Sequence, residues 1–410
     1  MHAFIVFAAA IAILAQAASS SLVSIPLHRR SATSFTNTDL TYDDGLLVGT
    51  ASVGNPPQQF EILFDTGSGL TWVPSSECTS GACKNREGYK ANESSTSVST
   101  GQIYKLSYGQ GQCIDAKVYM DTVRIAGYNV TNQQFGAATR VSGFNSQSYL
   151  GVFGLGDFSN DGGYYLNSTS KPNTIGSSEI RRRQTAPTSA SYASNAFMSN
   201  NNYTSPQFGT YVTTASTGFG KRWHTKGHFI FGGIDHSVYK GSIAYLPLVD
   251  SCDDNSSRFW KVPLTCVKFG HVDIKLHHNA NAAISTGTSF ISAPTKQAER
   301  IHHAIDCEYD SSANVYNIDC DKIDKLPDLV FTFHGYTVKL PSSAWTARKG
   351  DKCHTLIRRN TDSKNWILGG AFTNTFYTIF DLGSERVGLA IPKGQCDAKI
   401  YKHGQKAKTR

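Results

Sequence analysis

Two short turns, far apart in the chain, carry the residues best suited to chemistry. The first turn, Asp-Thr-Gly-Ser at residues 65–68, follows an apolar run, and the second, Ser-Thr-Gly-Thr at residues 285–288, follows another. Each turn is followed later in the chain by an apolar element containing glycine. This element is residues 152–156 for the first turn and residues 366–369 for the second. This repetition suggests a duplicated unit, with one active-site loop in each half of the chain.

The two turns differ in the residue that comes first. The carboxyl group of Asp65 can take up and release a proton, as a general acid or base must. The hydroxyl of Ser285 can hold a water molecule by hydrogen bonding, but it does not titrate in a useful range. A nucleophilic serine would need a positioned base, and the nearby His277 and His278 fall in a polar run before the strand. We therefore expect acid–base chemistry at Asp65 and no nucleophilic role for Ser285.

The elements that must position these turns are mostly β-strands. From Leu46 onward, short runs of alternating apolar residues are broken by Gly, Asn, Asp and Pro, as in residues 59–64, 122–125 and 228–231. This spacing predicts a mainly antiparallel β protein. The best helical segment is 294–305, with Pro294 placed as a first-turn proline.

A long polar segment, residues 157–206, interrupts the strand pattern. It is rich in Ser, Asn, Gly and Thr and contains three consecutive arginines, Arg181–Arg183. The composition predicts a long surface loop. The alternative is a processing site at Arg181–Arg183 that leaves two associated pieces.

Length and charge restrict the class of protein. A chain of 410 residues with 40% hydrophobic residues is typical of a soluble globular protein large enough for two domains. The net charge of +8 comes from basic residues that are scattered, apart from Arg181–Arg183 and the C-terminal run. We therefore expect no nucleic-acid partner. Because no metal-ligand spacing, phosphate loop or nucleotide fingerprint occurs, we expect no metal and no cofactor.

The N-terminal segment predicts entry into the secretory pathway. Residues 1–17 form an apolar run, too short to span a bilayer, that ends in Ala-Gln-Ala, so we expect a signal peptide and no stable membrane insertion. Nine cysteines fit an oxidising compartment. We expect a secreted protein, with the vacuole or the cell wall as alternatives. Five glycosylation sequons fit the same route, at Asn92, Asn129, Asn167, Asn202 and Asn255.

Taken in order, these motifs resemble the pepsin-like aspartic protease family over nearly all of residues 41–394. The resemblance implies an all-β, bilobal, double-ψ β-barrel architecture with a few short helices. It is carried by the Asp65 turn with Leu70–Ser75, by Tyr108–Gly111, by Phe231–Asp235 with Tyr239–Gly241, by Trp366–Gly369, and by the segment from Phe380 to Ala390. The implied domains are a short propeptide-like segment at 18–41, an N-terminal lobe at 42–215 that includes the polar insertion, a C-terminal lobe at 216–396, and a basic tail at 397–410.

The resemblance also assigns roles to individual residues. The catalytic pair would be Asp65 and Ser285, the latter in place of the family's second aspartate. Substrate-binding residues would be Gly67, Tyr108, Gly109, Gly287 and Thr288, and supporting residues would be Thr66, Ser68, Trp72 and Thr286. The implied disulfides join Cys78 to Cys83 and Cys320 to Cys353. An odd number of cysteines remains, Cys113, Cys252, Cys266, Cys307 and Cys396, and a Cys252–Cys266 bond is one possibility.

The family hydrolyses peptides with two carboxyl groups that share a proton about 3 Å apart and hold a water between them. One group takes a proton from the water while the other donates to the scissile carbonyl. With Ser285 in place of one carboxyl group, we expect an impaired or inactive endopeptidase homologue that keeps a peptide-binding cleft between the lobes. The alternative is an active acid endopeptidase that hydrolyses peptide bonds by water activation at Asp65. In either case we expect a monomer whose partner is a peptide or protein segment.

Overall fold

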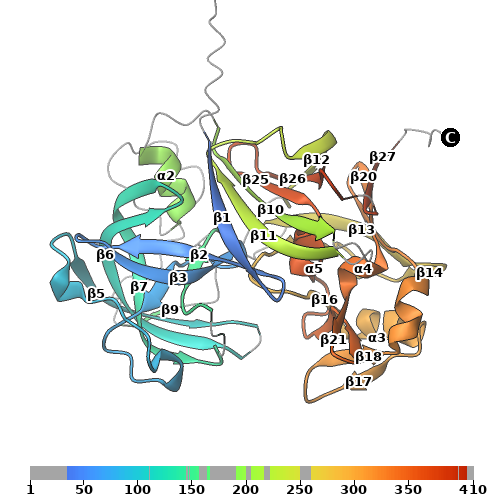
Figure 1. Cartoon of the computed structure of the whole chain (residues 1–410), viewed down its shortest axis with the longest axis horizontal. Coiled ribbons are helices and arrows are strands. Elements are labelled where there is room, and N and C mark those ends of the chain that lie inside the picture. Colours follow the sequence, from blue (N-terminus) through green and yellow to red (C-terminus); the bar gives the residue numbers. More distant parts are fainter. Residues whose placement is uncertain are drawn as a thin grey trace, which may run out of the picture. The chain divides into compact units, whose positions relative to one another are not determined.

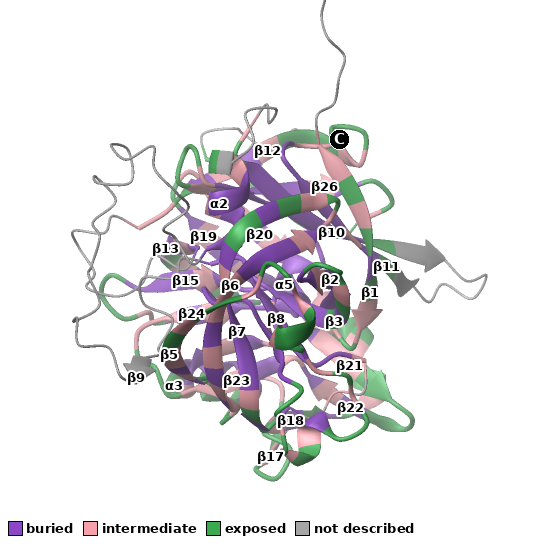
Figure 2. Ribbon diagram, turned by 90° about the vertical axis from the view of Figure 1, so that its left-hand side faces the viewer, coloured by how far each residue is buried: buried purple, intermediate pink, exposed green. Residues whose placement is uncertain are grey.

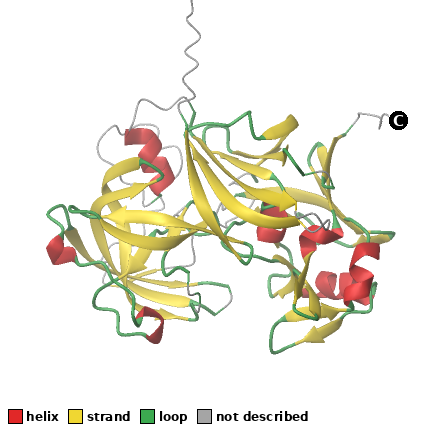
Figure 3. Ribbon diagram, in the orientation of Figure 1, coloured by secondary structure: helices red, strands yellow, loops and turns green. Residues whose placement is uncertain are grey.

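Strands dominate the computed structural model, which describes residues 35–109, 111–144, 146, 148–156, 164–166, 191–199, 205–216, 222–249, 260–395 and 397–403. Figures 1 and 3 show the strands gathered into two lobes, with only short helices between and beside them. The prediction of an all-β fold is confirmed.

The largest sheet has 14 strands and includes all those of the N-terminal half. Its order is β12-β26-β25-β10-β11-β1-β2-β3-β8-β4-β7-β6-β5-β9. The strands are β1 (Thr36–Asp43), β2 (Leu46–Val53), β3 (Gln58–Asp65), β4 (Trp72–Pro74), β5 (Val98–Ser107), β6 (Cys113–Ile125), β7 (Tyr128–Ser142), β8 (Val152–Gly154), β9 (Tyr164–Leu166), β10 (Gln207–Ser216), β11 (Arg222–Phe231), β12 (Tyr239–Pro247), β25 (Tyr377–Asp381) and β26 (Arg386–Pro392).

The C-terminal half contributes two further sheets. The nine-stranded sheet has the order β23-β16-β24-β15-β13-β19-β20-β27, with β14 paired to β13, and the small sheet has the order β17-β18-β22-β21. The strands are β13 (Lys261–Phe269), β14 (Val272–Ile274), β15 (Asn281–Ile284), β16 (Ile291–Pro294), β17 (Glu308–Asp310), β18 (Val315–Ile318), β19 (Leu329–Phe333), β20 (Tyr336–Leu340), β21 (Thr346–Lys349), β22 (Lys352–Thr355), β23 (Ile357–Asn360), β24 (Trp366–Leu368) and β27 (Lys399–Lys402).

The same strand arrangement occurs once in each half, as the repeated turns suggested. In the first half β3 runs parallel to β8, β8 antiparallel to β4, and β4 parallel to β7. In the second half β15 runs parallel to β24, β24 antiparallel to β16, and β16 parallel to β23. Each active-site turn therefore leaves the first strand of an equivalent four-strand group.

The described helices are short. The α-helices are α2 (Tyr192–Ser199), α3 (Thr295–His303), α4 (Ser342–Trp345) and α5 (Gly370–Thr373), and the 3₁₀ helices are η1 (Gly81–Cys83), η2 (Ala91–Glu93) and η4 (Cys320–Lys325). Helix α3 matches the predicted segment, but Pro294 is its N-cap residue and does not lie in the first turn. The cause is that Pro294 still belongs to β16, so the helix starts one residue later.

Two segments expected to be irregular contain regular structure. Within the predicted loop 157–206, α2 packs Tyr192, Ala193 and Ala196 into the core, so this part is not a surface loop. The Arg181–Arg183 run lies outside the described residues. In the expected tail 397–410, β27 pairs with β20, because Ala398 and Ile400 add apolar contacts to the core.

Buried residues line the strands through the middle of the fold, whereas exposed residues collect in the turns (Figure 2). The expected lobe boundaries at 41/42 and 215/216 fall inside β1 and β10. Since β1 pairs with both β11 and β2, it links strands from the two halves.

A buried carboxylate fixes one edge of the N-terminal half. Asp121 is fully buried and accepts hydrogen bonds from Tyr89 at 2.6 Å and from Ser94 at 2.7 Å. The hydroxyl of Thr96 and the main-chain N–H of Thr122 also donate to it. These bonds connect the segment after η2 to β6 and satisfy a charge that would otherwise be costly to bury.

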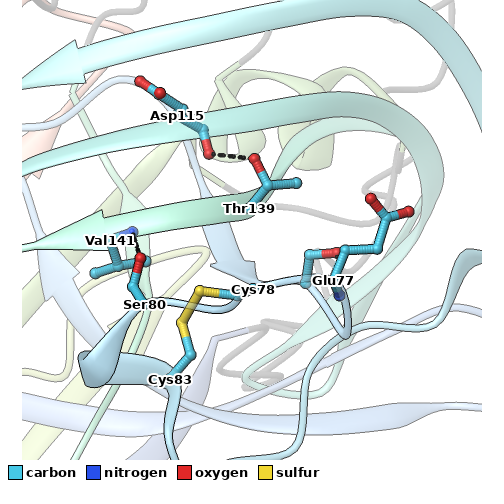
Figure 4. The surroundings of a disulfide bond; sticks show 8 residues. Glu77, Cys78, Ser80, Cys83, Asp115, Thr139 and Val141 are labelled. Carbon is cyan, nitrogen blue, oxygen red and sulfur yellow. Dashed lines mark hydrogen bonds between the residues drawn. A yellow bond between two sulfur atoms is a disulfide. The ribbon is translucent and has the colours of Figure 1, made fainter.

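Both expected disulfides are present. Cys78–Cys83 closes a small loop after β4 (Figure 4), and Cys320–Cys353 joins η4 to β22. Figure 4 also shows Ser80, between the two cysteines, accepting a 3.0 Å hydrogen bond from the N–H of Val141 in β7.

Three other cysteines, Cys113, Cys266 and Cys307, are free. The possible Cys252–Cys266 bond is therefore not formed. Cys252 itself and Cys396 lie outside the described residues.

Candidate active site

The two turns singled out in the sequence lie against each other, each at the end of a strand. β3 ends at Asp65, and β15 ends at Ile284, directly before Ser285. Thr66 and Thr286 join the turns, because the hydroxyl of each accepts the main-chain N–H of the other at 3.1 Å. These bonds connect residues 220 positions apart in sequence.

Both threonine hydroxyls also act as donors. Thr66 Oγ1 donates to the carbonyl of Ile284 at 2.9 Å, and Thr286 Oγ1 donates to the carbonyl of Phe64 at 2.6 Å. Both side chains are buried, so each polar group needs the partner it has. Four hydrogen bonds thus hold the first residues of the two turns side by side.

Asp65 and Ser285 face each other at this junction. Ser285 Oγ donates a long hydrogen bond, 3.4 Å, to Asp65 Oδ1, and both residues are buried. Each of the two side chains accepts a hydrogen bond from the main-chain N–H two residues later. Gly67 N–H donates to Asp65 Oδ1 at 2.7 Å, and Gly287 N–H donates to Ser285 Oγ at 3.3 Å. Ser285 therefore holds in the second turn the position that Asp65 holds in the first.

Glycine is needed beside both side chains because the opposite turn approaches so closely. A Cβ added to Gly287 would lie 2.1 Å from Asp65 Oδ1, and one added to Gly67 would lie 2.7 Å from Ser285 Oγ. Contacts this short are not tolerated, so both glycines are fixed by packing across the junction.

The environment of Asp65 favours the protonated carboxyl group. Burial raises the pKa of Asp65, and the hydrogen bonds from Ser68, Gly67 and Ser285 oppose this rise only in part. Ser68 Oγ donates to Asp65 Oδ2. A carboxyl group with a raised pKa is protonated up to a higher pH than a free aspartic acid.

The carboxyl group of Asp43 is hydrogen-bonded to another part of the N-terminal lobe and not to Asp65. Asp43, at the end of β1, accepts a hydrogen bond from Ser148. Tyr149 lies buried in the same region, and its pKa is raised to about 12 by burial and by the charges of Asp43 and Asp65. In the described part of the chain, the hydrogen bonds to Asp65 come from hydroxyl and amide groups and none from a second carboxyl group.

An aromatic group in the N-terminal lobe involves two more predicted residues. Trp72 Nε1 donates to the hydroxyl of Tyr108 at 2.8 Å, which ties the β5–β6 hairpin to β4. The ring of Phe144 meets both rings edge to face, with centroids 5.2 Å from Trp72 and 5.5 Å from Tyr108. Sequence reasoning identified Trp72 and Tyr108 but missed Phe144, which carries no local signal of this contact.

The remaining predicted residues lie around these two groups. Gly109 is exposed in the turn of the β5–β6 hairpin. Thr288 lies in the second turn, where its carbonyl accepts the N–H of Gly370 at 2.6 Å and its hydroxyl accepts that of Phe290 at 3.4 Å.

Sequence reasoning also missed a contact between the halves at the β1–β2 turn. Ser289 Oγ donates to the carbonyl of Asp44 at 2.5 Å, and Asn374 donates to the carbonyl of Gly45 at 2.8 Å. Asp44 and Gly45 both have positive φ angles, as an Asp-Gly hairpin turn requires. The dipeptide signals the turn, but it does not signal what binds the turn's carbonyls.

The arrangement offers the titratable carboxyl group of Asp65 together with several hydroxyl and amide donors. Within the described residues, no cluster of His, Cys, Asp or Glu side chains is placed to hold a metal ion. Across the same residues, no helix has the length and apolar character to cross a membrane. The Asp65 carboxyl group can transfer a proton, and the hydroxyl and amide groups around it can form hydrogen bonds.

Comparisons with known proteins show the family of the chain. Residues 47–391 match the family described as eukaryotic aspartyl protease, so the chain belongs to that family. It is 30% identical to embryonic pepsinogen from Gallus gallus, over 83% of this chain and 79% of the relative. It is also 30% identical to pepsin A from Suncus murinus, over 86% and 82% of the two chains. Human gastricsin is 28% identical, over 87% and 84%.

Proposed function

We propose that this protein binds peptides as an aspartic endopeptidase homologue whose hydrolytic activity is impaired by Ser285. The observation that carries the proposal is the hydrogen bond between Ser285 Oγ and Asp65 Oδ1, made from matching positions of the two turns. In the pepsin-like mechanism those positions belong to two carboxyl groups, so Ser285 takes the place of the second.

The impairment follows from the number of groups that can transfer a proton. When Asp65 is ionised it can remove a proton from water, but no second carboxyl group then donates a proton to the scissile carbonyl. When Asp65 is protonated it can donate, but among the described residues no second carboxyl group is hydrogen-bonded to it that could take the proton of the water. A serine hydroxyl cannot alternate between these roles, and catalytic groups that act as a unit lose most of their rate when one is removed.

Peptide binding does not depend on the missing carboxyl group. The Thr66–Thr286 junction, the glycines beside Asp65 and the Trp72–Tyr108 hydrogen bond are all formed with Ser285 in place. These features support a cleft between the lobes that receives a peptide or protein segment. We further propose a secreted monomer that carries glycans at the exposed Asn92 and Asn129; the other three sequons lie outside the described residues.

Peptide hydrolysis measured between about pH 3 and 6 tests the proposal. We expect Ser285→Asp to raise kcat/KM by at least about a thousandfold over the native chain, because it restores the missing proton donor. The matched control is Ser363→Asp, the same change at an exposed serine, which leaves the rate unchanged. Asp65→Asn in the Ser285→Asp background then removes the gained activity.

The competing function is an active acid endopeptidase that uses Asp65 and a water held by Ser285. The buried Asp65 with its raised pKa and the adjacent hydroxyl are the features that favour it. In that case the native chain matches Ser285→Asp in rate and Asp65→Asn alone abolishes hydrolysis. Retention of the native chain on an immobilised transition-state-like peptide, without turnover, supports binding alone.

A further inference from the structure

A row of lysines crosses the outer face of the C-terminal sheet. In the strand register, Lys268 of β13 lies opposite Val330 of β19, Val330 opposite Lys339 of β20, and Lys339 opposite Lys399 of β27. Neighbouring strands are about 4.8 Å apart, so the row extends about 15 Å across the strands. We call Lys268, Lys339 and Lys399 the lysine row.

The alternation along each strand shows that the row faces solvent. The residues next to the row positions in sequence are buried in the core: Val267, Leu329, Val338 and Leu340. Lys268 and Lys399 are exposed, and Lys339 and Val330 are partly exposed. Since successive side chains point to opposite faces of a sheet, the row stands on the outer face.

Hydroxyl groups form a second row beside the first. Thr332 of β19 lies opposite Thr337 of β20, and Thr337 opposite Tyr401 of β27. The ring of Tyr401, which is 38% exposed, lies 5.8 Å from Lys339 Nζ. Thr337 Oγ1 is 3.1 Å from His403 Nε2, so a further ionisable group borders the face.

The charges on this face are poorly compensated. Lys268 pairs with Asp273 of β14 at 3.0 Å. In contrast, the ion pairs found among the described residues include none for Lys339 or Lys399. Like charges directly opposite each other destabilise a sheet, so the fold gains nothing from placing these two lysines together.

We propose that the lysine row and the hydroxyls beside it form a docking surface for an anionic polysaccharide. The charge is complementary, and donors repeated across neighbouring strands fit an extended chain of anionic groups. Hydroxyl donors suit sulfate and carboxylate oxygens. Tyr401 alone gives no series of aromatic rings on which successive nucleic-acid bases could stack. The surface is made by β13, β19, β20 and β27, none of which carries Asp65.

Heparin is the probe for this surface. We expect the full chain to bind immobilised heparin at low salt and the Lys339→Gln/Lys399→Gln double variant to bind about thirtyfold more weakly. The matched control, Lys84→Gln/Lys240→Gln, changes two exposed lysines elsewhere and keeps the native affinity. The double variant is expected to fold, since removing opposed charges does not weaken the sheet.

A second variant is expected to change heparin affinity in the opposite direction. Asp273→Asn frees Lys268 from its ion pair, so heparin affinity rises by about fivefold. Loss of this gain in Asp273→Asn/Lys268→Gln would confirm that Lys268 is the group involved.

Two outcomes overturn the proposal. One is equal heparin affinity for the native chain and the Lys339→Gln/Lys399→Gln variant. The other is binding to anionic phospholipid vesicles or to duplex DNA that equals heparin binding and depends on the same lysines, which would assign the surface to a membrane or to nucleic acid. Both outcomes are independent of Ser285, because peptide hydrolysis and peptide binding are measured separately.

Discussion

Thr66 and Thr286 each accept the other's main-chain amide proton at 3.1 Å, and this exchange links the two halves of the chain. Replacing Thr286 with Val removes both the acceptor for Thr66 N–H and the donor to Phe64. Two buried groups then lack partners, so we expect the free energy of unfolding to fall by about 2–4 kcal/mol. Denaturant unfolding measures the loss.

Thr286→Ser is the matched control for this change. It keeps the hydroxyl, so both hydrogen bonds can form and most of the stability should return. Equal losses for the valine and serine variants would show that the methyl group matters and the hydrogen bonds do not.

Gly287→Ala tests the close approach of the two turns. Its Cβ would lie 2.1 Å from Asp65 Oδ1, which forces the turns apart. We expect the variant to lose retention on an immobilised transition-state-like peptide. Gly81→Ala provides the comparison, because open space surrounds that glycine. If Gly287→Ala bound the peptide as well as the native chain, the junction would not shape the binding site.

Tyr108→Phe tests the hydrogen bond that ties the β5–β6 hairpin to Trp72. Without the tyrosine hydroxyl the buried indole N–H has no acceptor, at a cost of about 1–3 kcal/mol. We expect faster amide hydrogen exchange in residues 98–125, with little change in the C-terminal lobe. Tyr119→Phe, on the same hairpin, should leave the exchange rates unchanged.

His302 makes the stability of the C-terminal lobe depend on pH. It is buried in α3, with its Nδ1 2.6 Å from the carbonyl of Ala298 and its Nε2 2.7 Å from Thr355 Oγ1. A carbonyl can only accept, so Nδ1 carries the proton and Nε2 accepts from the threonine. Burial lowers the pKa of His302 to about 4.

The sign of the effect follows from the two pKa values. Between pH 6.5 and about 4 the unfolded chain binds a proton at this residue and the folded chain does not. Stability therefore falls as the pH drops through this range, by roughly 3 kcal/mol in all. His302→Gln should flatten the dependence measured by denaturant unfolding, whereas His303→Gln, at an exposed neighbour, should not.

Much of this site could be predicted because short motifs fix it. The Asp-Thr-Gly and Ser-Thr-Gly turns follow apolar strands, and the family resemblance implies that Thr66 and Thr286 support them. The two expected disulfides were predicted for the same reason. In each case local sequence and family order carry the information.

Other features depend on partners distant in sequence and were missed. The residues of β27 are basic and indicate a tail, yet β27 pairs with β20 in the same sheet, and Ala398 and Ile400 pack against the core. α2 lies in a polar segment, and its order comes from burying Tyr192 and Ala193. Neither contact leaves a periodic pattern long enough to recognise.

The buried Asp121 has a consequence for the timing of biosynthesis. Its partner Ser94 is the hydroxyl residue of the Asn92 sequon, and in the folded chain that hydroxyl is already donated to the carboxylate. An enzyme that must engage Ser94 to attach a glycan can act only before this edge of the N-terminal half closes. The sequon at Asn129 ends in the exposed Thr131 and stays available for longer. If both sequons carry glycans, as proposed, the ratio of glycan occupancy at Asn92 and Asn129 would measure how soon this edge closes during folding.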